Sequence, residues 1–157
     1  MSDASHDVCF IADVMLGRLA RWLRLLGFDT LYYTDISDNR LLRVAREQRR
    51  FILTRDTRLV KIKGVKDYLL IKANDSFSQL REVIDTLKLT RFKLLSRCVT
   101  CNGILTRILD KNEIEDSVPE FIFLQFNFFL RCSDCGKVYW EGTHPKKFRE
   151  KLSEVLK

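Results

Sequence analysis

Four short apolar segments, each followed by a helix-like stretch, constrain the fold of this chain most. The β-favouring segments lie at residues 9–12, 30–33, 51–54 and 68–71, and the helix-like stretches follow at 15–26, 39–48, 57–63 and 76–87. This alternation predicts a parallel sheet flanked by helices, because parallel strands need crossover connections. We therefore expect an α/β fold that binds its ligands at the carboxyl ends of the strands.

An aspartate follows each of these segments at the predicted ligand-binding edge. The four are Asp13, Asp38, Asp56 and Asp75. If segments 9–12 and 51–54 are neighbouring strands, Asp13 and Asp56 project into one crevice and need a cation between them. Oxygen ligands suit Mg²⁺ or Mn²⁺, and the sequence offers no Ser-His or Cys-His nucleophile. Such ions activate water for phosphodiester hydrolysis, so the pattern predicts a metal-dependent nuclease.

Two of these aspartates have a structural alternative. Asp38 or Ser37 can cap the helix predicted from residue 39, and Asp75 can cap the helix predicted from residue 76. Capping alone explains such residues, because an N-cap side chain accepts hydrogen bonds from otherwise unpaired amides. Asp35 competes with Asp38 for the metal role, since it lies nearer the end of its strand.

Basic charge exceeds acidic charge and is unevenly placed. The chain has 28 Lys and Arg against 21 Asp and Glu, and residues 39–66 hold ten basic and two acidic residues. Such a patch suits a phosphate backbone, because neutralised phosphates release counterions, but a solvated helix face explains it equally well.

Arginines also lie beside the predicted acid site. Arg18, Arg21 and Arg24 are predicted on the polar face of helix 15–26, and Arg55 precedes Asp56. A phosphate at the start of this helix would meet its positive end and these side chains. The alternative is that the helix arginines only keep an amphipathic helix soluble.

Two Cys-x-x-Cys pairs follow residue 90 and predict a small β zinc ribbon. They are Cys98 with Cys101 and Cys132 with Cys135. Four thiolates close a tetrahedral shell, so the zinc is expected to be structural and to help fold a small segment. The fifth cysteine, Cys9, is expected to be a buried spacer. Residues 121–130 and 137–140 favour strands, and the phenylalanines of the first run are expected to pack in a core rather than stack on bases.

Nothing in the sequence predicts a membrane partner. No apolar stretch approaches the roughly 20 residues that span a bilayer, and residues 1–7 lack the features of a signal peptide. We therefore expect an intracellular, cytoplasmic protein.

The chain resembles the Mut-seven C-terminal RNase family in several places that follow one another in order. These are DVMLGRLARWLRLLGFD at residues 13–29, DNRLLRVA at 38–45, ILTRD at 52–56 and the two cysteine pairs. The resemblance implies a PIN-like nuclease domain at residues 8–90, a zinc-ribbon domain at 91–157, metal-dependent RNase activity and no nucleotide cofactor. It also implies that Asp13, Asp38 and Asp56 bind the catalytic metal with Asp75 as a weaker fourth ligand, while Asp29 is interpreted as structural.

Three functions follow as hypotheses. The first is an RNase that holds Mg²⁺ or Mn²⁺ on its aspartates and contacts RNA through Arg18, Arg21, Arg24 and Arg55, with the ribbon structural or gripping RNA. The second is a non-catalytic nucleic-acid-binding module in which the aspartates are caps. The third is a protein-interaction adaptor that uses the ribbon.

Overall fold

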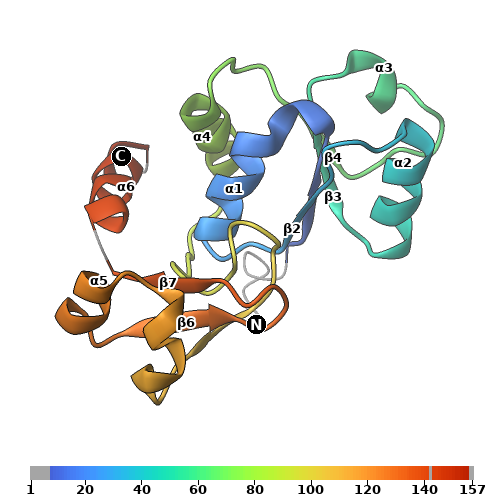
Figure 1. Cartoon of the computed structure of the whole chain (residues 1–157). Helices are drawn as coiled ribbons and strands as arrows, with labels where there is room; N and C mark the ends of the chain where they lie inside the picture. The colour runs from blue at the N-terminus through green and yellow to red at the C-terminus, as the bar shows by residue number, and fades with distance from the viewer. Residues whose placement is uncertain (1–7, 142, 156–157) are drawn as a thin grey trace, which may run out of the picture.

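The computed structural model describes residues 8–141 and 143–155, and Figure 1 shows a parallel sheet beside a smaller antiparallel one. The parallel sheet has the order β2-β1-β3-β4. Its strands are β1 (Phe10–Ala12), β2 (Thr30–Tyr32), β3 (Phe51–Thr54) and β4 (Tyr68–Leu70). All neighbouring strands run parallel, with Ile11 of β1 opposite Leu31 and Ile52. The predicted α/β fold is confirmed.

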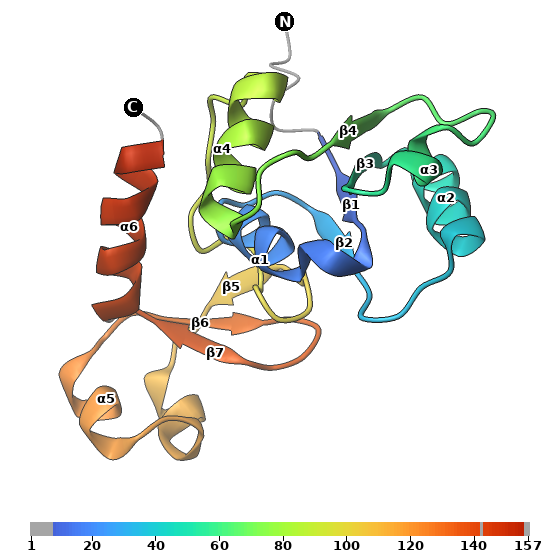
Figure 2. The same cartoon turned by 90° about the horizontal axis from the view of Figure 1, so that it is seen from above.

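Helices cover both faces of this sheet, as Figure 2 shows. A 3-10 turn, η2 (Val14–Leu16), leads into α1 (Gly17–Leu25), which packs with α4 (Ser76–Leu87) on one face. The other face carries α2 (Asp38–Glu47) and α3 (Thr57–Val60). Side chains alternate along β1, so Phe10 and Ala12 join the first core and Ile11 joins the second.

The first helix ends where the sequence predicts. Gly27 follows its C-cap with φ +96°, and a Cβ there would lie 2.6 Å from the carbonyl oxygen of Lys93. Glycine is therefore required both by the left-handed backbone and by the close approach of the later chain.

The second sheet is antiparallel, with the order β5-β6-β7. Its strands are β5 (Leu105–Arg107), β6 (Phe129–Cys132) and β7 (Val138–Trp140). A lobe formed by η3 (Lys111–Ser117) and α5 (Glu120–Gln125) connects β5 to β6.

The strand predicted at residues 121–130 is wrong over its first half, which forms α5. Pro119 is the N-cap residue and Glu120 lies in the first turn, where an acidic side chain favours a helix. Ile122 and Phe126, one helical turn apart, pack on the core formed around Ile114. The expected core role holds for Phe129, which is 1% exposed, whereas the exposed fractions of Phe121 and Phe128 are 65% and 42%.

The last helix, α6 (Thr143–Val155), returns to the parallel-sheet domain. Phe148 and Leu152 are buried in the core shared with α1, and the Phe148 ring stacks on Trp22 with the ring centroids 4.9 Å apart. The division at residue 90 stays a prediction, and contacts of this kind cross it. The expectation that residues 1–7 form no signal peptide concerns residues outside those that the structure describes. None of the helices described is long and apolar enough to span a bilayer.

Candidate functional site

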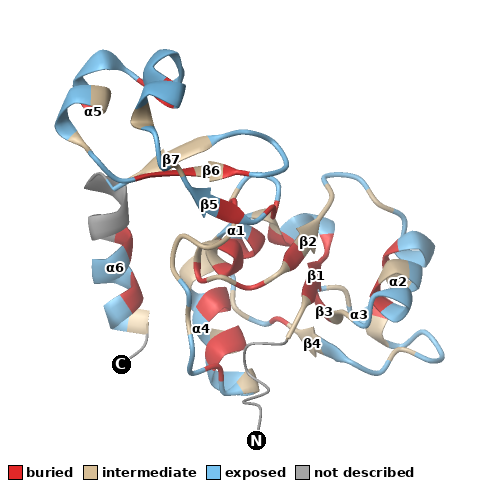
Figure 3. Cartoon of the chain, turned by 90° about the horizontal axis from the view of Figure 1, so that it is seen from below, coloured by how far each residue is buried: buried red, intermediate tan, exposed pale blue. Residues whose placement is uncertain are grey.

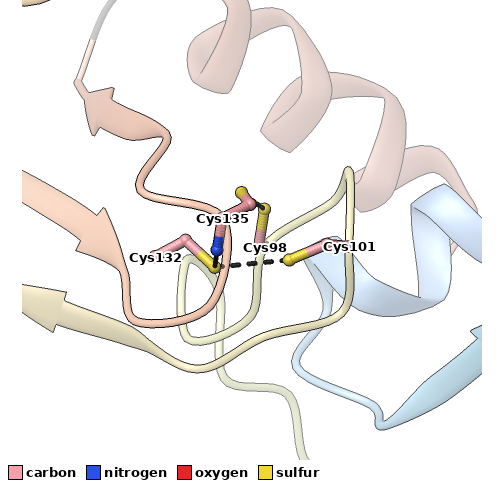
Figure 4. A group of neighbouring side chains, drawn as sticks. All are labelled: Cys98, Cys101, Cys132 and Cys135. Atoms are coloured by element: carbon pink, nitrogen blue, oxygen red, sulfur yellow. Dashed lines mark hydrogen bonds between the residues drawn. The ribbon is translucent and has the colours of Figure 1, made fainter.

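The four predicted zinc ligands converge between the ends of the ribbon strands (Figure 4). The Sγ atoms of Cys98, Cys101, Cys132 and Cys135 all lie within 4.8 Å of one another. Cys98 Sγ is 3.7 Å from Cys135 Sγ, and Cys101 Sγ is 3.4 Å from Cys132 Sγ. Zinc–sulfur bonds of about 2.3 Å place the corners of a tetrahedron about 3.8 Å apart. The cluster therefore fits a metal such as zinc.

The backbone of each knuckle is shaped for these ligands. The amides of Asp134 and Cys135 point at Cys132 Sγ, at 3.4 and 3.5 Å. A Cβ on Gly103 would lie 2.7 Å from the same sulfur, so glycine alone lets the first knuckle approach the second.

Tyr139 contacts the cluster directly, with its hydroxyl 2.9 Å from Cys98 Sγ. Burial raises the pKa of the Cys98 thiol, but hydrogen bonds from Tyr139 and from the backbone of Cys101 and Thr100 outweigh it and lower the pKa to about 6. A lowered thiol pKa favours the thiolate form of Cys98, the form that a metal requires, whereas burial raises the pKa of the Cys101 thiol.

The first knuckle is bonded to the parallel-sheet domain. Asn102 donates to Asp29 Oδ1 over 2.7 Å and accepts from the amide of Thr30 over 3.0 Å. Asp29 also accepts from Arg50 over 2.8 Å. Burial opposes ionisation of Asp29, but the hydrogen bonds from Arg50 and Asn102 lower the pKa of its carboxyl below the usual value. Asp29 therefore has a structural role, as expected.

Arg24 completes this junction and corrects one prediction. Its side chain is 5% exposed, and the guanidinium donates to the carbonyl oxygens of Thr30, Val99 and Thr100. The prediction that it shares the solvent-facing side of α1 with Arg18 and Arg21 is wrong, because its donors satisfy backbone carbonyls where the knuckle meets α1. We leave Arg24 out of the proposed RNA contacts.

The acidic edge of the parallel sheet is built around Thr54, the last residue of β3. Its buried hydroxyl donates to Asp13 Oδ2 over 2.7 Å and accepts from the amide of Asp56 over 3.0 Å. The Asp13 amide donates to the Leu53 carbonyl over 2.9 Å. One side chain thus connects the acids that follow the neighbouring strands β1 and β3.

These two acids differ in exposure and partners. Asp13 is 4% exposed, and its Oδ1 accepts from the Val14 amide over 2.8 Å. Asp56 is half-buried and caps α3, with Oδ1 accepting from the Arg58 amide over 2.8 Å. A carboxylate oxygen accepts more than one bond, so both residues keep lone pairs for a cation.

Asp38 and Asp75 lie at the same edge but at helix starts. Ser37, rather than Asp38, is the N-cap residue of α2, and Asp38 is the exposed first residue of that helix. Asp75 is the N-cap residue of α4, and hydrogen bonds from Ser78 lower the pKa of its carboxyl. Asp35 is exposed. In the described part of the chain no hydrogen bond links any of the three to Asp13 or Asp56.

The candidate ligands at the acid edge are all carboxylates. Among the described residues, only the cysteines form a group of three or more potential ligands within 4.8 Å of one another. Mg²⁺ commonly binds one or two carboxylates and completes its shell with water and substrate phosphate. Asp13 and Asp56, which are bonded to the same Thr54 hydroxyl, are the two acids that could serve as such carboxylates.

Three predicted phosphate-binding arginines face solvent. Arg18 and Arg21 are exposed on α1, and exposed Arg55 donates to Asn74 Oδ1 over 2.8 Å. Reasoning from sequence missed Thr54, Tyr139 and Asn102. Only Thr54 carried a signal, as a hydroxyl at a strand end two residues before Asp56.

Fold and site together define a class, an α/β domain with acids along the carboxyl edge of its sheet and a four-cysteine site in a β ribbon. A family model described as "Mut7-C RNAse domain" matches residues 8–152, nearly the whole chain. The chain belongs to this family, which confirms the resemblance and indicates an RNA-related nuclease function. No curated protein matches the sequence.

Proposed function

We propose that this protein is a metal-dependent ribonuclease that hydrolyses RNA phosphodiester bonds at the acid edge of its parallel sheet. The observation that carries the proposal is the Thr54 hydroxyl, which connects Asp13 to the backbone of Asp56 across two neighbouring strands. Membership of an RNase-domain family supports RNA as the substrate.

Each residue has a separate task in this proposal. Asp13 and Asp56 hold Mg²⁺ or Mn²⁺, and Asp38 and Asp75 orient water around the ion. Once bound, the ion lowers the pKa of water and stabilises charge on the phosphate. Thr54 keeps the Asp13 carboxylate in place, and Arg18, Arg21 and Arg55 contact RNA phosphates. A zinc ion on the four cysteines is structural, since no coordination position remains for water.

The proposal is tested with zinc-loaded protein, labelled single-stranded and structured RNAs, and Mg²⁺, Mn²⁺ or no added divalent ion. Cleavage is expected only with an added ion, and Asp13→Asn is expected to abolish it while circular dichroism stays that of the wild type. Comparison of Asp38→Asn with Asp35→Asn decides which acid contributes.

RNA that is bound but never cut, whatever the metal, would contradict the proposal. The non-catalytic binding module would then explain the protein better, with Asp56 and Asp75 acting as helix caps, as their hydrogen bonds already allow. The adaptor hypothesis gains only if RNA does not bind at moderate salt.

A further inference from the structure

A concave surface lies on the α2 side of the parallel sheet. It is a groove of about 640 Å³ between α2 and the segment that joins α3 to β4. Its volume falls within the roughly 300–1,000 Å³ typical of ligand sites. Figures 1 and 2 show α2 on the far side of the parallel sheet from α1 and α4. One lining residue, Arg50, connects the groove through Asp29 to Asn102 of the first cysteine knuckle.

Positive charge dominates this groove. Six basic residues and one acid, Asp67, line it; the basic residues are Arg43, Arg46, Arg49, Arg50, Lys63 and Lys66. Arg50 is bonded to Asp29. Within residues 8–141 and 143–155, the other five side chains form no ion pair or hydrogen bond, so their charges are available to a ligand. Figure 3 shows exposed residues on the outer side of α2.

Arg49 occupies a position where glycine is usual. It follows α2 with φ +52°, and the next amide, of Arg50, returns to the Ala45 carbonyl over 2.8 Å. This left-handed position at a helix end costs a side chain with a Cβ some backbone energy. An arginine in place of the usual glycine adds a positive charge to the groove at this energetic cost.

The groove leads toward the acid edge. Asn39, next to Asp38, lines it near the start of α2, and Arg49 lines it beyond the end. Ten helical residues span about 15 Å. A strand lying along α2 would therefore pass from the amino edge of the sheet to the edge that carries Asp13 and Asp56.

We infer that this groove is a second RNA-binding site, which holds the phosphate backbone of one strand of the substrate and directs it to the acids. Arg and Lys contacts of this kind position a nucleic acid without reading its sequence. The inference rests on the proposed ribonuclease function for the identity of the ligand. It predicts that an RNA long enough to lie along α2 binds more tightly through this groove, and not through the ribbon.

Two double variants of the zinc-loaded full chain test the groove. The first is Arg49→Gly with Lys66→Gln. Its matched control is Lys88→Gly with Arg81→Gln, because Lys88 also ends a helix in the left-handed region (φ +54°) and lies on α4, across the sheet. Both glycines relieve backbone strain, so neither melting temperature should fall.

Affinity for a labelled 12-nucleotide RNA is measured by anisotropy over a KCl series without added Mg²⁺ or Mn²⁺. The groove variant is expected to bind about tenfold more weakly, and the slope of log affinity on log salt should fall by about 1.4, or about 0.7 for each lost phosphate contact. The control should stay within twofold of the wild type. Equal affinities for groove variant and wild type, or an equal loss in the control, would overturn the inference.

Competition identifies the ligand. The labelled 12-mer is competed with unlabelled 12-mer, a 5′-mononucleotide or poly-glutamate. If the mononucleotide displaces it as well as the 12-mer does, the ligand of the groove is a free nucleotide rather than RNA. If poly-glutamate does so, the ligand is an acidic protein segment.

Cleavage assays distinguish this inference from the proposed function. With Mn²⁺, the groove variant should have a higher KM than the wild type and the same kcat. If wild type and variants all fail to cleave RNA and only the groove variant loses affinity for it, the groove is an RNA-binding site and the ribonuclease proposal is wrong.

Discussion

At the scale of single residues, Thr54 is the side chain that most directly shapes the acid edge. It has no exposed surface, and its hydroxyl uses both its donor and an acceptor position, toward Asp13 and Asp56. Without this hydroxyl, a carboxylate that is itself buried would lose its shortest hydrogen bond. The energetic cost therefore falls on the proposed metal ligand rather than on packing.

Replacement of Thr54 by valine keeps the shape and removes the hydroxyl. We expect Thr54→Val to lower kcat at least tenfold and the free energy of unfolding by about 1–3 kcal/mol, because Asp13 loses a buried donor. Urea unfolding and single-turnover cleavage measure the two effects. Thr54→Ser should restore most of the rate, and a Val variant with wild-type kcat would remove Thr54 from the site.

Asp29 makes stability depend on pH. Because its folded-state pKa is lowered, its contribution is present above the unfolded value and is lost as the pH falls through the folded pKa. Asp29→Asn should therefore unfold more easily by about 1–3 kcal/mol at pH 6, a difference that shrinks as the pH approaches 3. Denaturant unfolding at several pH values measures it. Exposed Asp35→Asn is the control, and a difference that does not change with pH would contradict the assignment.

At the scale of elements, the first cysteine knuckle and the start of β2 form one unit. Arg24 of α1 donates to the Val99 and Thr100 carbonyls, and Asn102 bonds Asp29 and Thr30. A metal on the cysteines would hold the backbone carbonyls and amides to which these side chains bond. Loss of the metal should therefore destabilise the parallel-sheet domain as well as the ribbon.

Metal content and metal removal test that coupling. We expect one zinc per chain by elemental analysis, lost in Cys132→Ser and kept in Ser133→Ala, its neighbour in the same knuckle. Chelation should lower the melting temperature and increase amide exchange in β2 along with the ribbon. Unchanged exchange in β2 after complete zinc removal would separate the two parts.

Sequence patterns predicted the elements whose periodicity agrees with their packing. The helix at residues 76–87 and the four parallel strands follow local propensity, and their acids fall at the predicted edge. The strand predicted at residues 121–130 was wrong, because a phenylalanine-rich run fits the period of a strand as well as that of a helix. Its first half is a helix because Pro119 is its N-cap residue and Ile122 packs on the core around Ile114. The site of Arg24 was also missed, since only the folded knuckle supplies its carbonyl partners.

At the scale of the whole molecule, α6 joins the C-terminal region to the first core. Phe148 is 7% exposed and stacks on Trp22, while Leu152 is 6% exposed in the same cluster. Short patterns in a sequence do not reveal such a return, because it depends on contacts between residues more than a hundred positions apart. The predicted division at residue 90 did not anticipate it.

This packing gives a prediction with an internal control. Phe148→Ala should lower the free energy of unfolding by about 3 kcal/mol, as expected when a buried aromatic ring is removed. Phe121→Ala removes the same ring where it is 65% exposed and should change stability by no more than about 0.5 kcal/mol. Thermal or urea unfolding compares them. Equal effects would show that α6 does not stabilise the core.

Asp13 and Asp56 are proposed to hold one divalent ion together, and a titration with Mn²⁺ measures whether they do. Electron paramagnetic resonance measures free Mn²⁺ as it is added to zinc-loaded wild type, Asp13→Asn and Asp56→Asn. We expect saturable binding by the wild type that is at least tenfold weaker in each variant, because each loses one of two carboxylate ligands. Wild-type protein that binds no Mn²⁺, or variants that bind it as tightly as the wild type, would show that these two aspartates do not form a metal site.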